Sequence, residues 1–132
     1  MENHMKLTIL TPEKEFYSGE ILSLNTENDD GRFGILASHV AMIAPLKPTV
    51  TKFIELNGKD LKAFTGAGIL RVHNDGVEML CGVCEWPEDI DLARANRAKE
   101  RAEERLNHKD EIDVKRAESS ILRALMRIKT KE

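Results

Sequence analysis

The fold of this chain is decided at residues 86–95, which read WPEDIDLARA. Upstream of Trp86, short apolar runs alternate with turn residues, a pattern typical of many short antiparallel strands. Downstream of Pro87, a helical spacing of apolar residues replaces the alternation and continues to the end of the chain. The sequence therefore predicts a mixed fold, with an all-β domain over residues 1–87 and an all-α domain over residues 88–132.

The N-terminal part has the turn signals of an antiparallel β-sandwich or flattened barrel. Leu7 and Ile9 alternate with polar residues, as a half-buried strand requires. Asn57-Gly58 separates two later apolar runs, and this dipeptide favours a two-residue hairpin because both residues tolerate positive φ. A second hairpin is expected across residues 74–76. Short strands at this spacing favour a sandwich.

The C-terminal part predicts an antiparallel helical hairpin that breaks at residues 107–110. Asp89 or Asp91 is expected to cap the first helix, and Asp110 the second. The residues expected to face one another are mostly alanine: Ile90, Ala93, Ala98, Ala102 and Leu106, then Ala117, Ile121, Ala124, Leu125 and Ile128. Such small side chains bury little area, so we expect the hairpin to be marginally stable alone and to move.

Composition and motifs exclude several classes of protein. The 132 residues carry a formal net charge of −3, which disfavours binding to nucleic acid. No apolar run is long enough to cross a bilayer, and residues 1–5 lack a signal-peptide pattern, so a cytosolic chain is expected. We find no phosphate-binding loop, dinucleotide fingerprint or nucleophile elbow, and the histidines show no metal-ligand spacing. Neither catalysis nor a metal site is expected.

Cys81 and Cys84 form a CxxC motif, which is a redox or zinc signal in other settings. Here it continues an apolar run that ends at Leu80, and no second pair exists. In a continuous strand, residues three apart point to opposite faces. We therefore predict two structural cysteines that are buried or half-buried. The alternative, a CxxC oxidoreductase, predicts that Cys84→Ser abolishes activity.

Arginines recur with the same spacing in both predicted helices. The spacings are seven and four residues, at Arg94, Arg101 and Arg105 and again at Arg116, Arg123 and Arg127. Residues at these spacings share one face of a helix. Guanidinium groups bind phosphate or carboxylate oxygens through two parallel hydrogen bonds. Two interpretations stand: a site for an anionic ligand, or a solvated face balanced by glutamates.

Three segments carry a resemblance to a known family. They are residues 7–9 with Phe16-Tyr17-Ser18-Gly19, residues 31–39 followed by Leu46-Lys47-Pro48, and residues 66–72. In order and spacing the chain resembles the ε subunit of bacterial F-type ATP synthases over nearly its whole length from Met5. Ala37 and Thr49 depart from the proline and glycine that are common in the family, which changes the stiffness of that loop.

The resemblance implies a flattened sandwich of about ten strands and a C-terminal helical hairpin. It implies a non-catalytic rotor subunit of the central stalk, which couples ion translocation to ATP synthesis. The partners would be the γ subunit, the c-ring and, through the hairpin, the catalytic α/β subunits. The protein would lie on the cytoplasmic face of the bacterial cell membrane without entering it. The rotor contacts would involve Asp29, Asp30, Gly31, Arg32 and His39.

Residues 90–95 fit the pattern I/L-D-x-x-R-A, by which some bacterial ε subunits recognise ATP. The resemblance requires no cofactor and makes ATP a candidate regulatory ligand. It assigns the site to Glu85, Ile90, Asp91, Arg94, Ala95, Arg101, Arg116, Arg123 and Arg127. A compact hairpin would hold ATP, and an extended one would reach the catalytic subunits and block hydrolysis. The alternative function is a free-standing ATP-sensing adaptor outside a rotary motor.

Overall fold

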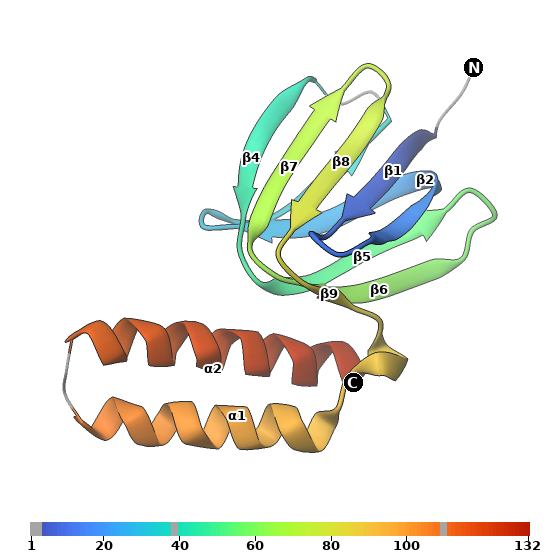
Figure 1. The fold of residues 1–132 in the computed structure, drawn as a ribbon. Coiled ribbons are helices and arrows are strands. Elements are labelled where there is room, and N and C mark those ends of the chain that lie inside the picture. The colour runs from blue at the N-terminus through green and yellow to red at the C-terminus, as the bar shows by residue number, and fades with distance from the viewer. Residues whose placement is uncertain (1–3, 38–39, 109–110) are drawn as a thin grey trace.

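The computed structural model describes residues 4–37, 40–108 and 111–132. His39 and Asp110, which were predicted to contact the rotor and to cap a helix, lie outside these ranges. The described residues form a β-sandwich followed by two antiparallel helices, which confirms the predicted fold class (Figure 1). Within these residues the sandwich has nine strands, where about ten were expected.

The strands form one continuous sheet that folds over on itself. They are β1 (Met5–Leu10), β2 (Glu15–Asn28), β3 (Gly31–Leu36), β4 (Met42–Leu46), β5 (Thr49–Glu55), β6 (Asp60–Thr65), β7 (Gly68–His73), β8 (Gly76–Cys81) and β9 (Cys84–Glu85). Their order is β4-β7-β8-β1-β2-β5-β6-β9, and β3 pairs with β2. Both hairpins are present, but the two-residue turn predicted at Asn57-Gly58 is wrong. The β5–β6 loop has three residues, since the Glu55 N–H donates to the Lys59 carbonyl oxygen at 2.8 Å, and Gly58 adopts φ +90° within it. In the second hairpin Gly76, the first residue of β8, adopts φ +141°.

The sandwich core contains the side chains that the alternating pattern selected, including Leu7, Ile9 and Ile21. Aromatic rings close its end beside the helices. The Trp86 ring stacks on Phe16 with centroids 4.4 Å apart. The segment between the sandwich and α1, residues 85–91, is called the join. The stacking holds the join against the β-domain, because Trp86 immediately precedes the first helical turn.

Cys81 and Cys84 correct one prediction from the sequence. Both are buried free thiols, as expected. The strand is not continuous, however, because the chain bends at Gly82 and changes its pairing partner from Gly68 to Thr65. The two side chains consequently share one core and hydrogen-bond to each other, instead of pointing to opposite faces. This hydrogen bond, together with burial, raises the pKa of the Cys84 thiol.

The helical part begins with a short 3-10 turn, η1 (Pro87–Asp89), and continues with α1 (Leu92–Arg105), η2 (Leu106–His108) and α2 (Glu111–Lys131). Of the two candidate caps for α1, Asp91 is the one used, since its Oδ1 accepts a hydrogen bond from the Arg94 N–H at 3.0 Å. This is a standard N-cap geometry, which satisfies a free N–H group of the first turn.

The buried face of the hairpin differs from the predicted one at three positions, Ala93, Ala95 and Leu125. Ala95, Ala102, Ala117 and Ala124 are buried, whereas Ala93 and Leu125 are exposed. Each helical residue turns the side-chain direction by about 100°, so Ala93 lies nearly opposite Ala95. The predicted close packing of small residues is otherwise confirmed by the buried Ala102, Ala117 and Ala124.

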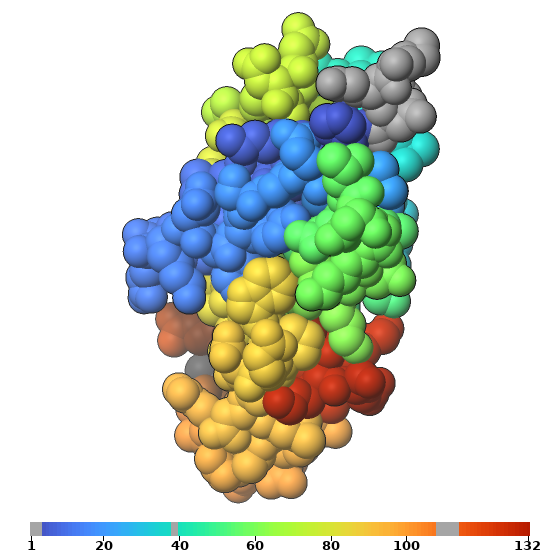
Figure 2. Space-filling view, turned by 90° about the vertical axis from the view of Figure 1, so that its right-hand side faces the viewer, coloured from blue at the N-terminus to red at the C-terminus, as the bar shows by residue number. Residues whose placement is uncertain are grey.

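The helices form two further layers on the sandwich. Helix α2 lies between α1 and strands β5 and β6 (Figure 1). On these strands Val50 and Phe64 are register partners, and both are buried beneath the helical layer. Figure 2 shows the last residues of α2 beside the join, below the edge formed by β5 and β6. The end of α2 therefore meets β5, β6 and the join, and we call this contact region the seam.

Candidate functional site

A cleft of about 480 Å³ lies at this seam. Its walls come from the join, from the first turns of α1 and from the last turns of α2. The lining residues are Glu85, Asp89, Asp91, Arg94, Ala95, Ala98, Arg101 and Arg127. Chain segments that are 42 positions apart, at Glu85 and Arg127, thus contribute to one cavity.

Most of the ATP-site residues taken from the resemblance meet in this cleft. Glu85, Asp91, Arg94, Ala95, Arg101 and Arg127 line it, whereas Ile90 is buried beside Asp91 and is not part of the lining. Arg116 is exposed elsewhere on α2, and Arg123 donates to the Ser120 hydroxyl at 3.2 Å. Neither lines the cleft in this conformation.

Two lining residues, Asp89 and Ala98, were missed by the sequence reasoning. Ala98 lies one helical turn after Arg94 and three positions before Arg101, so its spacing alone places it on the same face. Its small side chain leaves room between the two guanidinium groups. Asp89 ends the 3-10 turn, and no sequence pattern indicated that its side chain would reach the cavity.

Arg127 is the point where α2 is fastened to the sandwich. Its Nε donates to Glu85 Oε1 at 2.5 Å, and the two side chains are 27% and 30% exposed. The same guanidinium lies over the Phe64 ring, 4.6 Å from its centroid. One turn further on, the Lys131 ammonium donates to the Pro87 carbonyl oxygen at 2.9 Å. These contacts join the end of α2 to β6, β9 and the first helical turn.

The remaining arginines of the cleft are available to a ligand. Within the described residues, the side chains of Arg94 and Arg101 make no hydrogen bond and no ion pair, whereas Asp91 is used as a cap and Glu85 is paired with Arg127. The first turn of α1 adds unpaired N–H groups and the positive end of the helix dipole. The cleft is therefore suited to an anion with several negatively charged oxygens.

The residues predicted to face the rotor lie around the β2–β3 turn. Asp29 and Asp30 are exposed at its tip, and the Asp30 N–H donates to the Asn28 side chain at 2.8 Å. Gly31 adopts φ +125°, a conformation that other residues rarely adopt. Arg32 is directed away from this tip and donates to the Val50 carbonyl oxygen on β5 at 2.9 Å.

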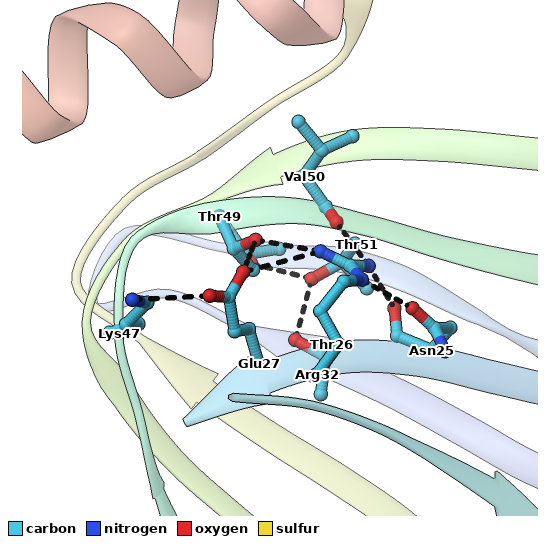
Figure 3. A network of polar contacts seen from close by, with 9 residues as sticks. Asn25, Thr26, Glu27, Arg32, Lys47, Thr49, Val50 and Thr51 are labelled. Carbon is cyan, nitrogen blue, oxygen red and sulfur yellow. Dashed lines mark hydrogen bonds and ion pairs between the residues drawn. The ribbon is translucent and has the colours of Figure 1, made fainter. Parts of the chain in front are cut away.

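A partly exposed network of ion pairs and hydrogen bonds surrounds Arg32, whose side chain is 40% exposed (Figure 3). The Glu27 carboxylate accepts from the Thr49 hydroxyl at 2.8 Å and pairs with Lys47 at 3.1 Å. Burial by itself would raise the pKa of Glu27. The hydrogen bonds from Thr49 and Lys47 and the charges of Lys47 and Arg32 outweigh this effect, so the pKa lies below its ordinary value.

The outer face of β4, β7 and β8 exposes an apolar patch that the sequence analysis did not single out. Ile43 is 73% exposed, Ile69 46% and Leu80 39%. Pairing places Ile69 beside Leu80 and opposite Pro45 on β4. Clustered apolar side chains on a sheet face are typical of a surface that another protein covers.

The described part of the chain contains neither a metal-binding cluster nor a helix able to span a membrane. No group of three or more histidine, cysteine or acidic side chains has a metal-binding arrangement there. None of its helices combines the length and the hydrophobicity needed to cross a membrane.

Comparison with known families gives a match along the whole described chain. Residues 4–87 match the domain described as "ATP synthase, Delta/Epsilon chain, beta-sandwich domain", and residues 88–132 match the "long alpha-helix domain" of the same description. The chain therefore belongs to the family of ATP synthase delta/epsilon chains.

Within this family the similarity is to bacterial ε chains. The chain is 54% identical over 128 residues to the ATP synthase epsilon chain of Clostridium kluyveri, covering 97% of both chains. It is 52% identical to that of Clostridium botulinum strain Okra, covering 100% of this chain and 99% of the relative. The resemblance to a bacterial F-type ε subunit is thus confirmed.

Solved structures share the fold at low sequence identity. A chain of the Euglena gracilis mitochondrial ATP synthase superposes with a TM-score of 0.85 at 18% identity, covering 95% of this chain and 79% of that one. A chain from the Tetrahymena thermophila central stalk and c-ring gives a TM-score of 0.66 at 14% identity, covering 97% and 96%. The sandwich followed by helices is therefore a recurring architecture.

Proposed function

We propose that this chain is a non-catalytic rotor subunit in the central stalk of a bacterial F-type ATP synthase. It takes part in coupling ion translocation to ATP synthesis and regulates ATP hydrolysis through its C-terminal hairpin, which binds ATP. The observation that carries the regulatory part is the position of the arginine-lined cleft. Its walls belong to both helices and to the join, so a ligand there contacts the parts that must separate when the hairpin moves.

In this proposal, bound ATP stabilises the docked state of the hairpin relative to the extended state. Arg94 and Arg101 hold the phosphates from α1, while Arg127 contributes from α2. A ligand shifts a conformational equilibrium only by its differential affinity for the two states. A preference of about 1.4 kcal/mol for the docked state changes the ratio of the states tenfold. Extension of α2 separates Arg127 from α1 and dismantles the cleft, which supplies the differential affinity.

The polar contacts that hold the docked state lie close to the end of α2, which suits a reversible element. The fastening residues are Arg127 and Lys131, close to the end of α2, and the interface between the helices is built from alanines. In the extended state the cationic side chains of Arg116, Arg123 and Lys129 meet acidic surfaces of the catalytic α/β subunits. That contact blocks rotation in the direction of hydrolysis.

The sandwich supplies the rotor contacts. The exposed tip of the β2–β3 turn, with Asp29 and Asp30, faces the c-ring. The apolar patch of Ile43, Ile69 and Leu80 is covered by the γ subunit, because an apolar surface of this kind is stabilised when another protein removes it from water. Held in this way, the chain lies peripherally on the cytoplasmic face of the cell membrane.

Calorimetry of the full-length chain with ATP tests the ligand. Arg94→Ala and Arg101→Ala are expected to weaken binding at least tenfold, since each removes a charge-assisted contact worth about 1.5–3 kcal/mol. Arg105→Ala is the matched control, because Arg105 lies on the same helix outside the cleft lining. Absence of any binding heat at millimolar ATP refutes the sensing role.

A reconstituted enzyme tests regulation separately. A complex containing a chain that ends at Pro87 should hydrolyse ATP faster than one containing the full chain. Equal rates refute inhibition by the hairpin. Co-purification with the γ subunit and the c-ring distinguishes the rotor subunit from a free-standing adaptor, which would bind neither.

A further inference from the structure

Strands β2 and β5 separate at the point where Arg32 reaches between them. Their pairing ends at Asn25 and Lys52, whereas β2 continues with β3 as far as Asn28 and Gly31. Beyond the last pair, the two backbones no longer hydrogen-bond to each other. The Arg32 guanidinium fills this gap, and its Nη2 donates to the Val50 carbonyl oxygen at 2.9 Å. A side chain thus replaces missing ladder hydrogen bonds between the strands.

The guanidinium is held in place from both sides of the gap. On β2, Arg32 Nε donates to Asn25 Oδ1 at 2.8 Å. On β5, Nη1 donates to the Thr49 hydroxyl at 3.0 Å, and Thr49 in turn donates to Glu27 at 2.8 Å (Figure 3). Thr49 is buried. A planar fork with five donors can serve these acceptors together, whereas a lysine ammonium cannot match their geometry.

Val50 connects this network to the helical hairpin. Its carbonyl oxygen accepts from Arg32, while its side chain points toward the helical layer (Figure 3). Val50 is buried and is the register partner of Phe64, over whose ring the Arg127 guanidinium lies. An unbroken series of contacts therefore runs from the β2–β3 turn through Arg32 and Val50 to the end of α2.

We propose that Arg32 is a positioning residue for the docked hairpin, which couples the β2–β3 turn to the ligand cleft. It fixes the first half of β5, on which α2 rests. A partner that holds the turn thereby favours hairpin docking, and docking in turn orders the turn. The ligand part of this inference rests on the proposed function, whereas the docking part does not.

The test uses the full-length chain and three variants. Arg32→Met removes all five donors and keeps the length of the side chain, and Arg32→Lys keeps the charge and loses the fork. Arg71→Met is the matched control, because Arg71 is a strand arginine on β7 that pairs with Glu78 on β8, and neither strand pairs with β2, β3 or β5. Hydrogen exchange of α2 amides reports docking without ATP, and calorimetry reports ATP affinity.

Both Arg32 variants should speed exchange in α2 and weaken ATP binding roughly fivefold, a coupling of ordinary size. The control should behave as the wild type does. Wild-type exchange in α2 and wild-type ATP affinity for Arg32→Met would overturn the proposal. If the wild type binds no ATP, the proposed ligand fails and α2 exchange alone decides the role of Arg32.

One measurement needs no variant and separates coupling from a merely structural role. Coupling between two sites is reciprocal. Saturating ATP should therefore slow hydrogen exchange in the wild-type β2–β3 turn, at residues 29–32, and this protection should disappear in Arg32→Lys. A wild-type chain that binds ATP without any change in this turn would refute the coupling, even if every variant failed to fold.

Discussion

Phe64→Ala should release the helical hairpin while leaving the sandwich folded. Phe64 is fully buried, yet it lies on the outer face of β6, where α2 and Arg127 cover it. In the undocked state the ring is exposed to water. Its burial therefore stabilises docking and contributes little to the folding of the sandwich itself.

The size of the effect follows from two contributions. Burying a phenylalanine side chain on docking stabilises the docked state by about 1.5–3 kcal/mol. The guanidinium above the ring, 4.6 Å from its centroid, adds about 0.5–1 kcal/mol for a partly exposed pair. Their sum is about 3 kcal/mol, which corresponds to a roughly hundredfold shift toward the undocked state.

Hydrogen exchange resolved along the chain is the assay. In Phe64→Ala, protection should fall in α2 and remain in the strands β1, β2 and β8. Phe53→Ala is the contrasting variant, because Phe53 lies inside the sandwich and its loss should destabilise the strands. Lys62→Ala controls for substitution on the same strand face. Unchanged α2 protection, or global unfolding like that of Phe53→Ala, would refute the reasoning.

Three further predictions concern the sandwich. The pKa of Glu27 is lowered in the folded protein. The stability that ionised Glu27 contributes is therefore present above the ordinary pKa of 4.5 and is lost as the pH falls through the folded pKa. The acid-induced drop in the free energy of unfolding should consequently be smaller in Glu27→Gln than in the wild type. Cys81 and Cys84 should react with iodoacetamide only slowly before denaturation, and rapid labelling measured by mass spectrometry would contradict their burial. Gly76→Ala should lower the melting temperature and cost more than about 1 kcal/mol, because the new Cβ would meet the Lys6 carbonyl oxygen at 2.5 Å and φ is +141°; an unchanged melting temperature would contradict this geometry.

Several features could be predicted from the sequence because they depend on neighbours along the chain. The hairpin at Asn57-Gly58 was predicted, although not its three-residue loop, because Gly58 tolerates the positive φ that the loop requires. The cap of the first helix was narrowed to Asp89 or Asp91, of which the structure uses Asp91, and the shared face of Arg94 and Arg101 follows from helical geometry. The change from alternating to helical spacing after Trp86 was enough to predict a sandwich followed by a hairpin.

Other features were decided only by tertiary structure. The bend between Cys81 and Cys84 brings the two thiols together because the chain changes its pairing partner, which no local spacing reveals. Arg32 stays partly exposed and reaches from β3 to acceptors on β2 and β5, which become accessible to it because these two strands separate there. Long-range pairing of this kind depends on which buried polar groups remain to be satisfied, and these are known only once the strands are in place.

The candidate cleft combines features that the sequence predicts with features that only the tertiary structure decides. The sequence alone placed Asp91 among the candidate caps of the first helix, and Arg94 and Arg101 on one face of that helix, since residues seven apart share a face. Only the packed structure brought Arg127 to Glu85 and left Arg116 and Arg123 outside the cleft. The physical reason is that the seam forms where α2 rests on β5 and β6, and that position depends on burial of side chains from three separate segments of the chain.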